Sequence, residues 1–311
     1  MKLSRFITSA LVAAALVVGP AAAAGGGKKP HSPKEGWTFQ GGTNTFFGKF
    51  DKESVQRGYQ VYSQVCANCH SMDLMSFRNL GEKGGPYYDP LYPNATENPA
   101  VKAFAAEKIV QDGPNEEGDM FDRPARPSDS FVNPWPNEAI AKAANGGALP
   151  PDLSVIVKAR AGGADYIYSL LTGYPSFDDF QYDENGDAYL EIEDEYHEGH
   201  TNKLIQPVGL YYNPYFPGDT SANFDGDPRH VPYGGYLAMS APLLEGIVEY
   251  QDGTEATVEN MARDVTTFLA WASDPKQTAR KETGLAVMAY LLILAILLWF
   301  SYKRIWRNVD H

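Results

Sequence analysis

Apolar residues recur at helical spacing in two stretches that lie far apart in the chain. From Asp51 to about Val65, the side chains at positions 55, 59, 62 and 65 fall on one face, and Asp51 stands where a helix cap belongs. The second stretch runs from Thr257 to Ser273 and ends before Pro275. Its apolar stripe consists of Val258, Met261, Val265, Phe268, Leu269 and Ala272. The pattern predicts two amphipathic helices.

Shorter helical patterns appear between these two stretches. One covers Glu138–Ala144, and another spans Ser154–Arg160 or lies at Ala164–Leu171. The chain has no internal repeat, and its 29 glycines and 22 prolines interrupt periodicity over long stretches. We therefore predict a mainly α fold whose helices are joined by long irregular loops.

An uncharged apolar run covers residues 283–302. About twenty apolar residues are enough to cross a bilayer, so this run predicts one transmembrane helix, although a buried core helix is the alternative. Trp299, Tyr302 and Trp306 stand where aromatic residues of a membrane interface belong. We predict an anchor over residues 281–302, followed by a cytoplasmic tail over residues 303–311.

The N-terminus has the pattern of an export signal. Lys2 and Arg5 precede an apolar segment from Ile7 to Val18, and small residues follow at 21–24. The apolar segment is too short for a membrane span. We predict that residues 1–24 are a signal peptide and that residues 25–280 form a domain on the periplasmic side of a bacterial inner membrane.

Charge and cysteine content narrow the classes of function. The 311-residue chain has a formal net charge of −13 and a pI of about 4.9. This charge argues against binding to nucleic acid and favours a basic partner. The two cysteines, Cys66 and Cys69, are followed directly by His70 in a C-x-x-C-H motif. That motif indicates covalent attachment of a c-type haem, with the histidine as the proximal iron ligand.

Three other interpretations of the cysteine pair are weaker. A thioredoxin-like redox site needs a βαβ context that the flanking sequence lacks, and a structural zinc site usually needs four ligands. A disulfide between Cys66 and Cys69 would close almost no loop. With haem attached, the helix before the motif and the helix near the end of the domain match the packing pair of a class I cytochrome c fold.

The second axial ligand must come from another part of the chain. Met72 and Met75 are too close to His70, while Met261 lies on a helix stripe and Met288 in the anchor. Met120 and Met239 remain, and Met239 is favoured because it lies in a Gly/Pro-containing loop just before the final helix of the domain. Three histidines are rival ligands: His197, His200 and His230.

Several stretches together resemble the cytochrome c1 family, the haem subunits of cytochrome bc1 complexes. They include R-G-Y-Q-V-Y-S-Q-V-C-A-N-C-H-S-M at 57–72 and A-A-N-G-G-A-L-P-P-D-L-S at 143–154. Further matching stretches lie at 111–118, 158–166, 169–174, 209–218 and 252–257. The resemblance covers nearly the whole exported domain and the single C-terminal anchor.

The resemblance implies roles for individual residues. Cys66 and Cys69 would form the thioether bonds of one haem c, and His70 and Met239 would bind the iron. Arg160 and Tyr166 would contact the haem propionates, and Asn145 and Pro151 would line the pocket. Two features depart from the family pattern: Ser240-Ala241-Pro242 replaces consecutive prolines after the methionine, and residues 173–209 contain an acidic insertion.

The resemblance also implies the function. The chain would pass single electrons from a Rieske iron–sulfur protein to a cytochrome c, in a complex with cytochrome b, and would perform no bond chemistry itself. An anchored carrier outside such a complex is the first alternative, and a haem sensor or peroxidase with an open distal site is the second. The acidic segment 178–198 is either a solvated loop or a surface that attracts a basic cytochrome c.

Overall fold

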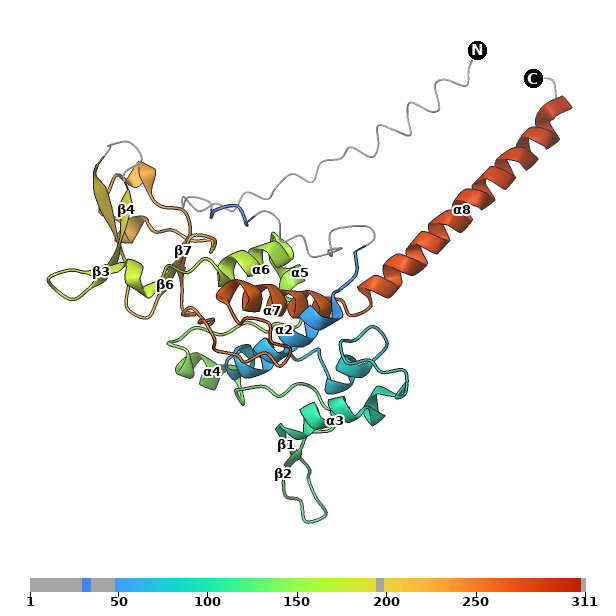
Figure 1. The fold of residues 1–311 in the computed structure, drawn as a ribbon, viewed down its shortest axis with the longest axis horizontal. Helices are drawn as coiled ribbons and strands as arrows, with labels where there is room; N and C mark the ends of the chain where they lie inside the picture. The colour runs from blue at the N-terminus through green and yellow to red at the C-terminus, as the bar shows by residue number, and fades with distance from the viewer. Residues whose placement is uncertain (1–29, 35–47, 194–198, 309–311) are drawn as a thin grey trace.

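Two helices from opposite ends of the chain lie side by side at the centre of the molecule (Figure 1). The computed structural model describes residues 30–34, 48–193 and 199–308. Helix α2 spans Lys52–Gln64, and the Asp51 carboxylate accepts a hydrogen bond from the Glu53 amide at 3.2 Å. Helix α7 spans Val258–Ser273, and the Thr257 hydroxyl accepts from the Asn260 amide at 3.1 Å. Both helices confirm the apolar periodicity, and Asp51 confirms the predicted cap of α2.

A glycine and an ion pair bring α2 and α7 close together. A Cβ atom placed on Gly58 would lie 2.0 Å from the carbonyl oxygen of Asp264, so only glycine permits this approach. The Arg57 Nε donates to the Asp264 carboxylate at 2.7 Å, and the Ser54 hydroxyl donates to it at 2.6 Å. The buried charge of Asp264 is thus paired and hydrogen-bonded.

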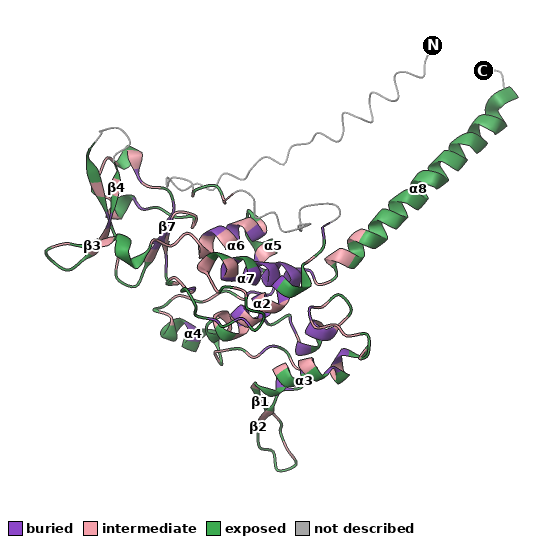
Figure 2. Ribbon diagram, in the orientation of Figure 1, coloured by how far each residue is buried: buried purple, intermediate pink, exposed green. Residues whose placement is uncertain are grey.

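The core forms around this helix pair. Figure 2 shows α7 as mostly buried. Trp271 and Phe268 of α7 are fully buried, and the ring of Phe268 lies 5.4 Å from that of Tyr62 and 5.7 Å from that of Tyr59. Helix α3, Pro99–Ala106, adds Val101 and Ala105 to the same cluster. The aromatic residues of α2 therefore pack against α7 as the apolar stripes predicted.

The shorter helices lie around the central pair. Helix α4 spans Glu138–Ala144, as predicted. The two alternative positions for a fourth helix are both helical, because α5 spans Ile156–Ala159 and α6 spans Gly163–Leu171. Gly162, with φ of +85°, lies between them, and Gly163, the first residue of α6, has φ of +56°. These glycines adopt the left-handed conformation that turns the chain between α5 and α6.

Short strands occupy regions that the sequence pattern predicted as loops. Strands β1 (Ile109–Asp112) and β2 (Phe121–Pro124) form one hairpin. Strands β3 (Phe180–Tyr182), β4 (Ala188–Glu193) and β5 (Thr201–Ile205) form a three-stranded antiparallel sheet. Strands β6 (Tyr211–Asn213) and β7 (Gly235–Leu237) form another antiparallel pair. The described part of the acidic segment contains β3 and β4 in place of an irregular loop, and residues 194–198 lie outside the described residues.

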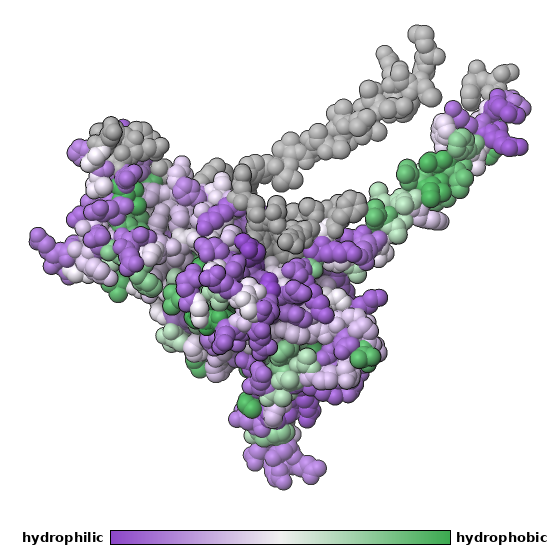
Figure 3. All heavy atoms as spheres, viewed as in Figure 1, coloured by the Kyte–Doolittle hydropathy of each residue, from purple (hydrophilic) through white to green (hydrophobic). Residues whose placement is uncertain are grey.

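One long helix leaves the domain at its C-terminal end. Helix α8 spans Gln277–Ile305 and contains the predicted membrane span. It is the one helix of the described ranges long and apolar enough to cross a membrane. Figures 1 and 3 show it projecting from the domain with an apolar middle section. The helix begins before the apolar run, and Arg280 in its first turns donates to the Asp274 carboxylate at 2.8 Å. The predicted signal peptide, and residues 309–311 of the predicted tail, lie outside the described part of the chain.

Candidate functional site

The cysteine motif lies at the end of α2, which delivers the chain into a short 3-10 turn over Cys66–Asn68. The carbonyl of Cys66 accepts hydrogen bonds from the amides of Cys69 at 3.1 Å and His70 at 2.9 Å. Both cysteines are free thiols; Cys66 is partly buried and Cys69 is exposed. The helix therefore presents two unpaired thiols and an imidazole within one compact turn.

The environment of Cys66 argues against a thioredoxin-like redox site. Burial raises the pKa of the Cys66 thiol to about 12. A reactive C-x-x-C redox site needs a thiolate with a lowered pKa, so the local electrostatics do not favour that chemistry. Within the described ranges, no group of three or more His, Cys, Asp or Glu side chains is arranged to hold a metal ion.

The imidazole of His70 has a fixed orientation. Its Nδ1 lies 2.8 Å from the carbonyl oxygen of Pro151. A carbonyl only accepts hydrogen bonds, so Nδ1 carries the proton and Nε2 keeps its lone pair. Burial lowers the pKa of His70, although the Pro151 carbonyl and Asp152 oppose this effect. The ring is thus a neutral imidazole whose Nε2 is the atom suited to bind iron.

Asp152 connects the loop that contains Pro151 to the residues after His70 through hydrogen bonds. Its carboxylate accepts from the Ser71 hydroxyl at 2.9 Å and from the Asp73 amide at 2.8 Å. The Leu153 amide also donates to the Ser71 carbonyl at 2.9 Å. Burial alone would raise the pKa of Asp152, but hydrogen bonds from Ser154, Asp73 and Ser71 hold it below the usual range. Sequence reasoning missed this role, although Asp152 belongs to the stretch 143–154.

Asn145 and Trp135 each donate a side-chain hydrogen bond to a backbone carbonyl. Asn145 caps the end of α4, and its side-chain amide donates to the Ala141 carbonyl at 2.7 Å. Trp135, which sequence reasoning did not select, donates its indole N–H to the Cys69 carbonyl at 3.2 Å. Its only sequence signal is its position between two prolines.

Arg160 and Tyr166 lie near each other around the start of α6. Arg160 is exposed, and its guanidinium donates to the Ala159 carbonyl at 3.2 Å. Tyr166 is buried; burial raises its pKa, and the nearby charge of Arg160 partly offsets that rise. Within the described ranges, Arg160 has no carboxylate partner, so its charge faces solvent beside a phenol.

Met239 follows β7 and is partly buried. Its carbonyl accepts a hydrogen bond from the Tyr174 hydroxyl at 2.9 Å, just beyond the end of α6. The rival Met120 lies 53% exposed next to β2, and His200 is also exposed. His230 lies in a short 3-10 turn, and His197 falls outside the described residues.

One continuous segment contacts both predicted axial ligands. Pro151, at its start, accepts the hydrogen bond from His70, and Tyr174, at its end, donates one to Met239. Helices α5 and α6, which contact each other and α7, lie between these two points. The segment 151–174 also contains Asp152, Arg160 and Tyr166. Five of the candidate or supporting residues therefore lie on this segment, and both predicted axial ligands contact it.

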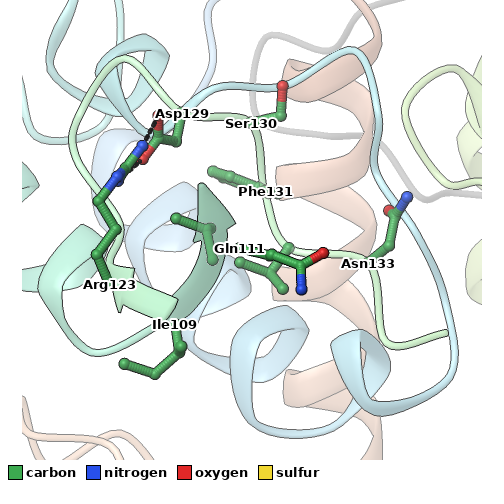
Figure 4. Close-up of a pocket in the computed structure, with 9 residues that line it drawn as sticks. Ile109, Gln111, Arg123, Asp129, Ser130, Phe131 and Asn133 are labelled. Carbon is green, nitrogen blue, oxygen red and sulfur yellow. Dashed lines mark hydrogen bonds and ion pairs between the residues drawn. The ribbon is translucent and has the colours of Figure 1, made fainter. Parts of the chain in front are cut away.

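The donors fit a covalently attached haem. Free thiols at the required spacing, a neutral histidine with its Nε2 uncommitted, and a thioether residue tied to the same segment form a suitable donor set. A separate pocket of about 340 Å³ lies between β1 and residues 129–133. Figure 4 shows Arg123 in that pocket directed at Asp129, with its Nη1 2.6 Å from the carboxylate. None of the predicted site residues lines it.

Comparison with known proteins places these features in a family context. Residues 37–309 match the Cytochrome C1 family. The chain is 37% identical to cytochrome c1 of Rhodospirillum rubrum over 311 residues, covering 99% of this chain and 100% of that protein. It is 39% identical to the mitochondrial cytochrome c1, heme protein, of Kluyveromyces lactis over 279 residues, covering 90% of this chain and 77% of that protein.

A third relative is a longer polypeptide. The chain is 43% identical over 282 residues to a protein of Bradyrhizobium diazoefficiens named cytochrome b/c1. The match covers 89% of this chain but only 36% of that protein. The chain thus spans about a third of this relative and most or all of the other two.

Proposed function

The chain belongs to the cytochrome c1 family, and we propose that it relays single electrons from a Rieske iron–sulfur protein to a cytochrome c. As a cytochrome c1, it is a haem protein of electron transport and belongs with the subunits of the bc1 oxidoreductase. Its C-terminal apolar helix fits a membrane anchor. The direction of the relay and its partners are the proposed part.

The observation that carries the proposal is the hydrogen bond between the His70 Nδ1 and the Pro151 carbonyl. It leaves Nε2 as the iron-binding atom beside two free thiols that fit the thioether bonds. Met239 is the proposed sixth ligand. A c-type haem, when bound, supplies a one-electron couple. Histidine and methionine together would occupy both axial positions, raise the potential and exclude dioxygen from the iron.

The other candidate residues act around that centre. Arg160 is exposed and has no carboxylate partner within the described ranges, which suits a propionate, and Tyr166 has a phenol that can donate to the same group. Pro151 orients the proximal imidazole, and Asn145 belongs to the adjoining loop. In the proposed relay, these side chains transfer no proton and take part in no bond chemistry. Their role is to bind and orient the haem and to exclude water.

The proposed partners follow from the family and the charge. A relative whose name joins cytochrome b and c1 supports cytochrome b as a neighbour. The net charge of −13 suits a basic cytochrome c as acceptor. We place the haem domain on the periplasmic side of a bacterial inner membrane, with residues 1–24 removed after export and the tail in the cytoplasm.

The test uses the tagged full-length chain, purified from native membranes, and its Met239→Leu variant. We expect both proteins to carry covalent haem and to copurify with a cytochrome b and an iron–sulfur protein. Loss of the thioether ligand should lower the midpoint potential substantially and slow reduction of cytochrome c, because a methionine ligand raises the potential. Redox titration and optical spectra measure both effects.

Two results would contradict the proposal in different ways. An unchanged axial spectrum and potential in Met239→Leu would remove Met239 as the ligand. A haem-loaded chain that purifies without cytochrome b and iron–sulfur protein would instead indicate an anchored carrier outside such a complex. A native spectrum with an open sixth position would favour the sensor or peroxidase alternative.

A further inference from the structure

Tyr174 directs its hydroxyl at the backbone of a residue 65 positions further along the chain. The phenol donates to the Met239 carbonyl at 2.9 Å. A tyrosine phenol has an ordinary pKa of about 10, so it keeps its proton at physiological pH and is a hydrogen-bond donor to the Met239 backbone.

The stretch Ala238–Pro242 has few other contacts that fix it. It begins after Leu237 of β7 and ends before Leu243, both of which are buried. Apart from the β6–β7 ladder, the Tyr174 bond is the one hydrogen bond that these five residues make to the rest of the described chain. Residues 240 and 241 are Ser and Ala, which restrict the backbone less than proline would. A single side chain thus holds the middle of this stretch.

Tyr174 is itself held in place by its surroundings. The Lys34 ammonium donates to the Thr172 carbonyl at 3.1 Å and to the Thr172 hydroxyl at 2.7 Å, which caps the end of α6. The Asn213 amide donates to the Leu170 carbonyl at 2.9 Å. A Cβ atom on Gly173 would lie 2.5 Å from the ring of Tyr215, so the chain is tightly packed there. Tyr174 therefore projects from a rigid base.

We propose that Tyr174 is the positioning residue for Met239, fixing the backbone of the sixth ligand in place of the proline pair that this loop lacks. The inference rests on the proposed function, in which Met239 binds the iron. Because the carbonyl is held, the Met239 side chain starts from a defined backbone orientation. A neutral hydrogen bond typically contributes about 1 kcal/mol net, so its loss should raise the population of the ligand-open state about fivefold.

The test is Tyr174→Phe in the full-length chain within its native membranes. Covalent haem content should be unchanged. Carbon monoxide should bind the reduced protein about fivefold faster, because it reacts with the state in which the sixth position is open. The midpoint potential should stay close to that of the parent, because Met239 still binds the iron in most molecules. These readouts do not depend on turnover, and loss of the methionine ligand itself would instead lower the potential.

Tyr236→Phe is the matched control. It removes the same kind of bond, from a phenol to the Ile205 carbonyl at 2.8 Å, and Tyr236 is only three positions from Met239. It should leave carbon monoxide binding and potential unchanged. Equal behaviour of the two phenylalanine variants would overturn the proposal.

A third variant separates this inference from its premise. If Met239→Leu changes the potential and the spectrum but Tyr174→Phe leaves carbon monoxide binding unchanged, Met239 remains the ligand and the role of Tyr174 is wrong. If Met239→Leu leaves the potential and the spectrum unchanged, both the proposed ligand role of Met239 and the positioning role of Tyr174 are wrong. If Tyr174→Phe loses its haem, 3-fluorotyrosine at 174 replaces it: the stronger phenol donor should slow carbon monoxide binding, and faster binding would contradict the proposal.

Discussion

At the scale of the residue, one buried carboxylate joins three parts of the chain. Asp274 follows α7 and is 8% exposed. It accepts from the Arg280 guanidinium of α8 at 2.8 Å, and the Lys158 ammonium of α5 lies 3.2 Å away. The hydrogen bond from Arg280 is the largest cause that holds the pKa of Asp274 below its usual range, against the opposing effect of burial. The carboxylate thus connects the anchor to the helix that precedes α6.

Replacing Asp274 should have a pH-dependent effect on stability. Because its pKa is lowered on folding, the charged form stabilises the protein above the unfolded pKa of about 3.9, and this contribution is lost as pH falls through the folded value. Asp274→Asn should therefore reduce the free energy of unfolding by about 2 kcal/mol near neutral pH. The difference from the unsubstituted protein should shrink below about pH 4. Denaturant unfolding of the detergent-solubilised chain measures it.

Asp165→Asn is the control, because the pKa of Asp165 is shifted in the opposite direction from that of Asp274. Burial raises the pKa of Asp165, and its Oδ1 has no hydrogen-bond partner within the described ranges. Its charged form costs free energy, a cost present at neutral pH and removed as pH falls below its folded pKa. The variant should be as stable as the parent or more so at neutral pH. Equal destabilisation by both variants would show that the ion pairs of Asp274 contribute nothing specific.

At the scale of the element, the contact between α2 and α7 determines where the cysteine motif lies. The approach of the two helices depends on Gly58, which faces the Asp264 backbone, and on Arg57, which bonds to the Asp264 side chain. The helix that delivers Cys66 is thereby fixed to the last helix of the domain. A shift of α2 would move the thiols and His70 together.

Gly58→Ala tests this contact. Helix propensity alone favours alanine by about 1 kcal/mol, but the new Cβ atom would lie 2.0 Å from a carbonyl oxygen. We expect a net loss of about 1–3 kcal/mol and a lower yield of covalent haem. Gln64→Ala, at an exposed position of the same helix, should leave both unchanged. A fully stable, haem-loaded Gly58→Ala protein would show that α2 and α7 can separate without consequence.

At the scale of the whole molecule, acidic side chains gather on the three-stranded sheet, which lies at the end of the domain away from α8 (Figure 1). Segment 178–198 contains ten acidic residues and no lysine or arginine. Some have structural roles: the Asp183 carboxylate accepts from the Asn185 and Asp187 amides, and that of Asp179 accepts from the Ser176 amide. The other described acidic side chains of this sheet are exposed and bear charge without such bonds.

Neutralising those free charges should weaken attraction of a basic cytochrome c. The variant changes four exposed residues to their amides: Glu184, Asp187, Glu191 and Glu193. Electron transfer to cytochrome c should slow with ionic strength in the parent, since salt shortens the Debye length to roughly 8–10 Å. The variant should show a flatter dependence with an unchanged haem spectrum. Stopped-flow kinetics over a salt series measures this slope.

A second set of amides controls for net charge. The control variant changes four exposed acidic residues of the β1–β2 hairpin to their amides: Glu116, Glu117, Asp119 and Asp122. It changes the net charge by the same amount, but on another side of the molecule. Their neutralisation should leave most of the salt dependence. Should the hairpin set flatten the slope and the sheet set leave it intact, the sheet is not the surface that attracts the partner.

The sequence by itself determined those features whose cause is local. Apolar spacing placed α2, α4 and α7 within a residue or so, because a helix is set by neighbours three and four positions apart, and Asp51 marked the start of α2. The uncharged run placed the membrane span inside α8 for the same reason. Cys66, Cys69 and His70 could be proposed as the haem-binding residues because the motif is contiguous and its spacing is typical of c-type haem attachment.

Only the tertiary structure decided the features that depend on distant partners. Three such features are the strands of the acidic segment, the hydrogen bond between Asp152 and Ser71, and the bond from Tyr174 to Met239. Each joins residues whose flanking sequence has no periodic pattern. A hydrogen bond across 65 positions depends on how α6 and β7 pack, which no local pattern encodes. The sequence therefore specified which groups can bind haem, whereas the packing of the chain specified which side chains hold them in place.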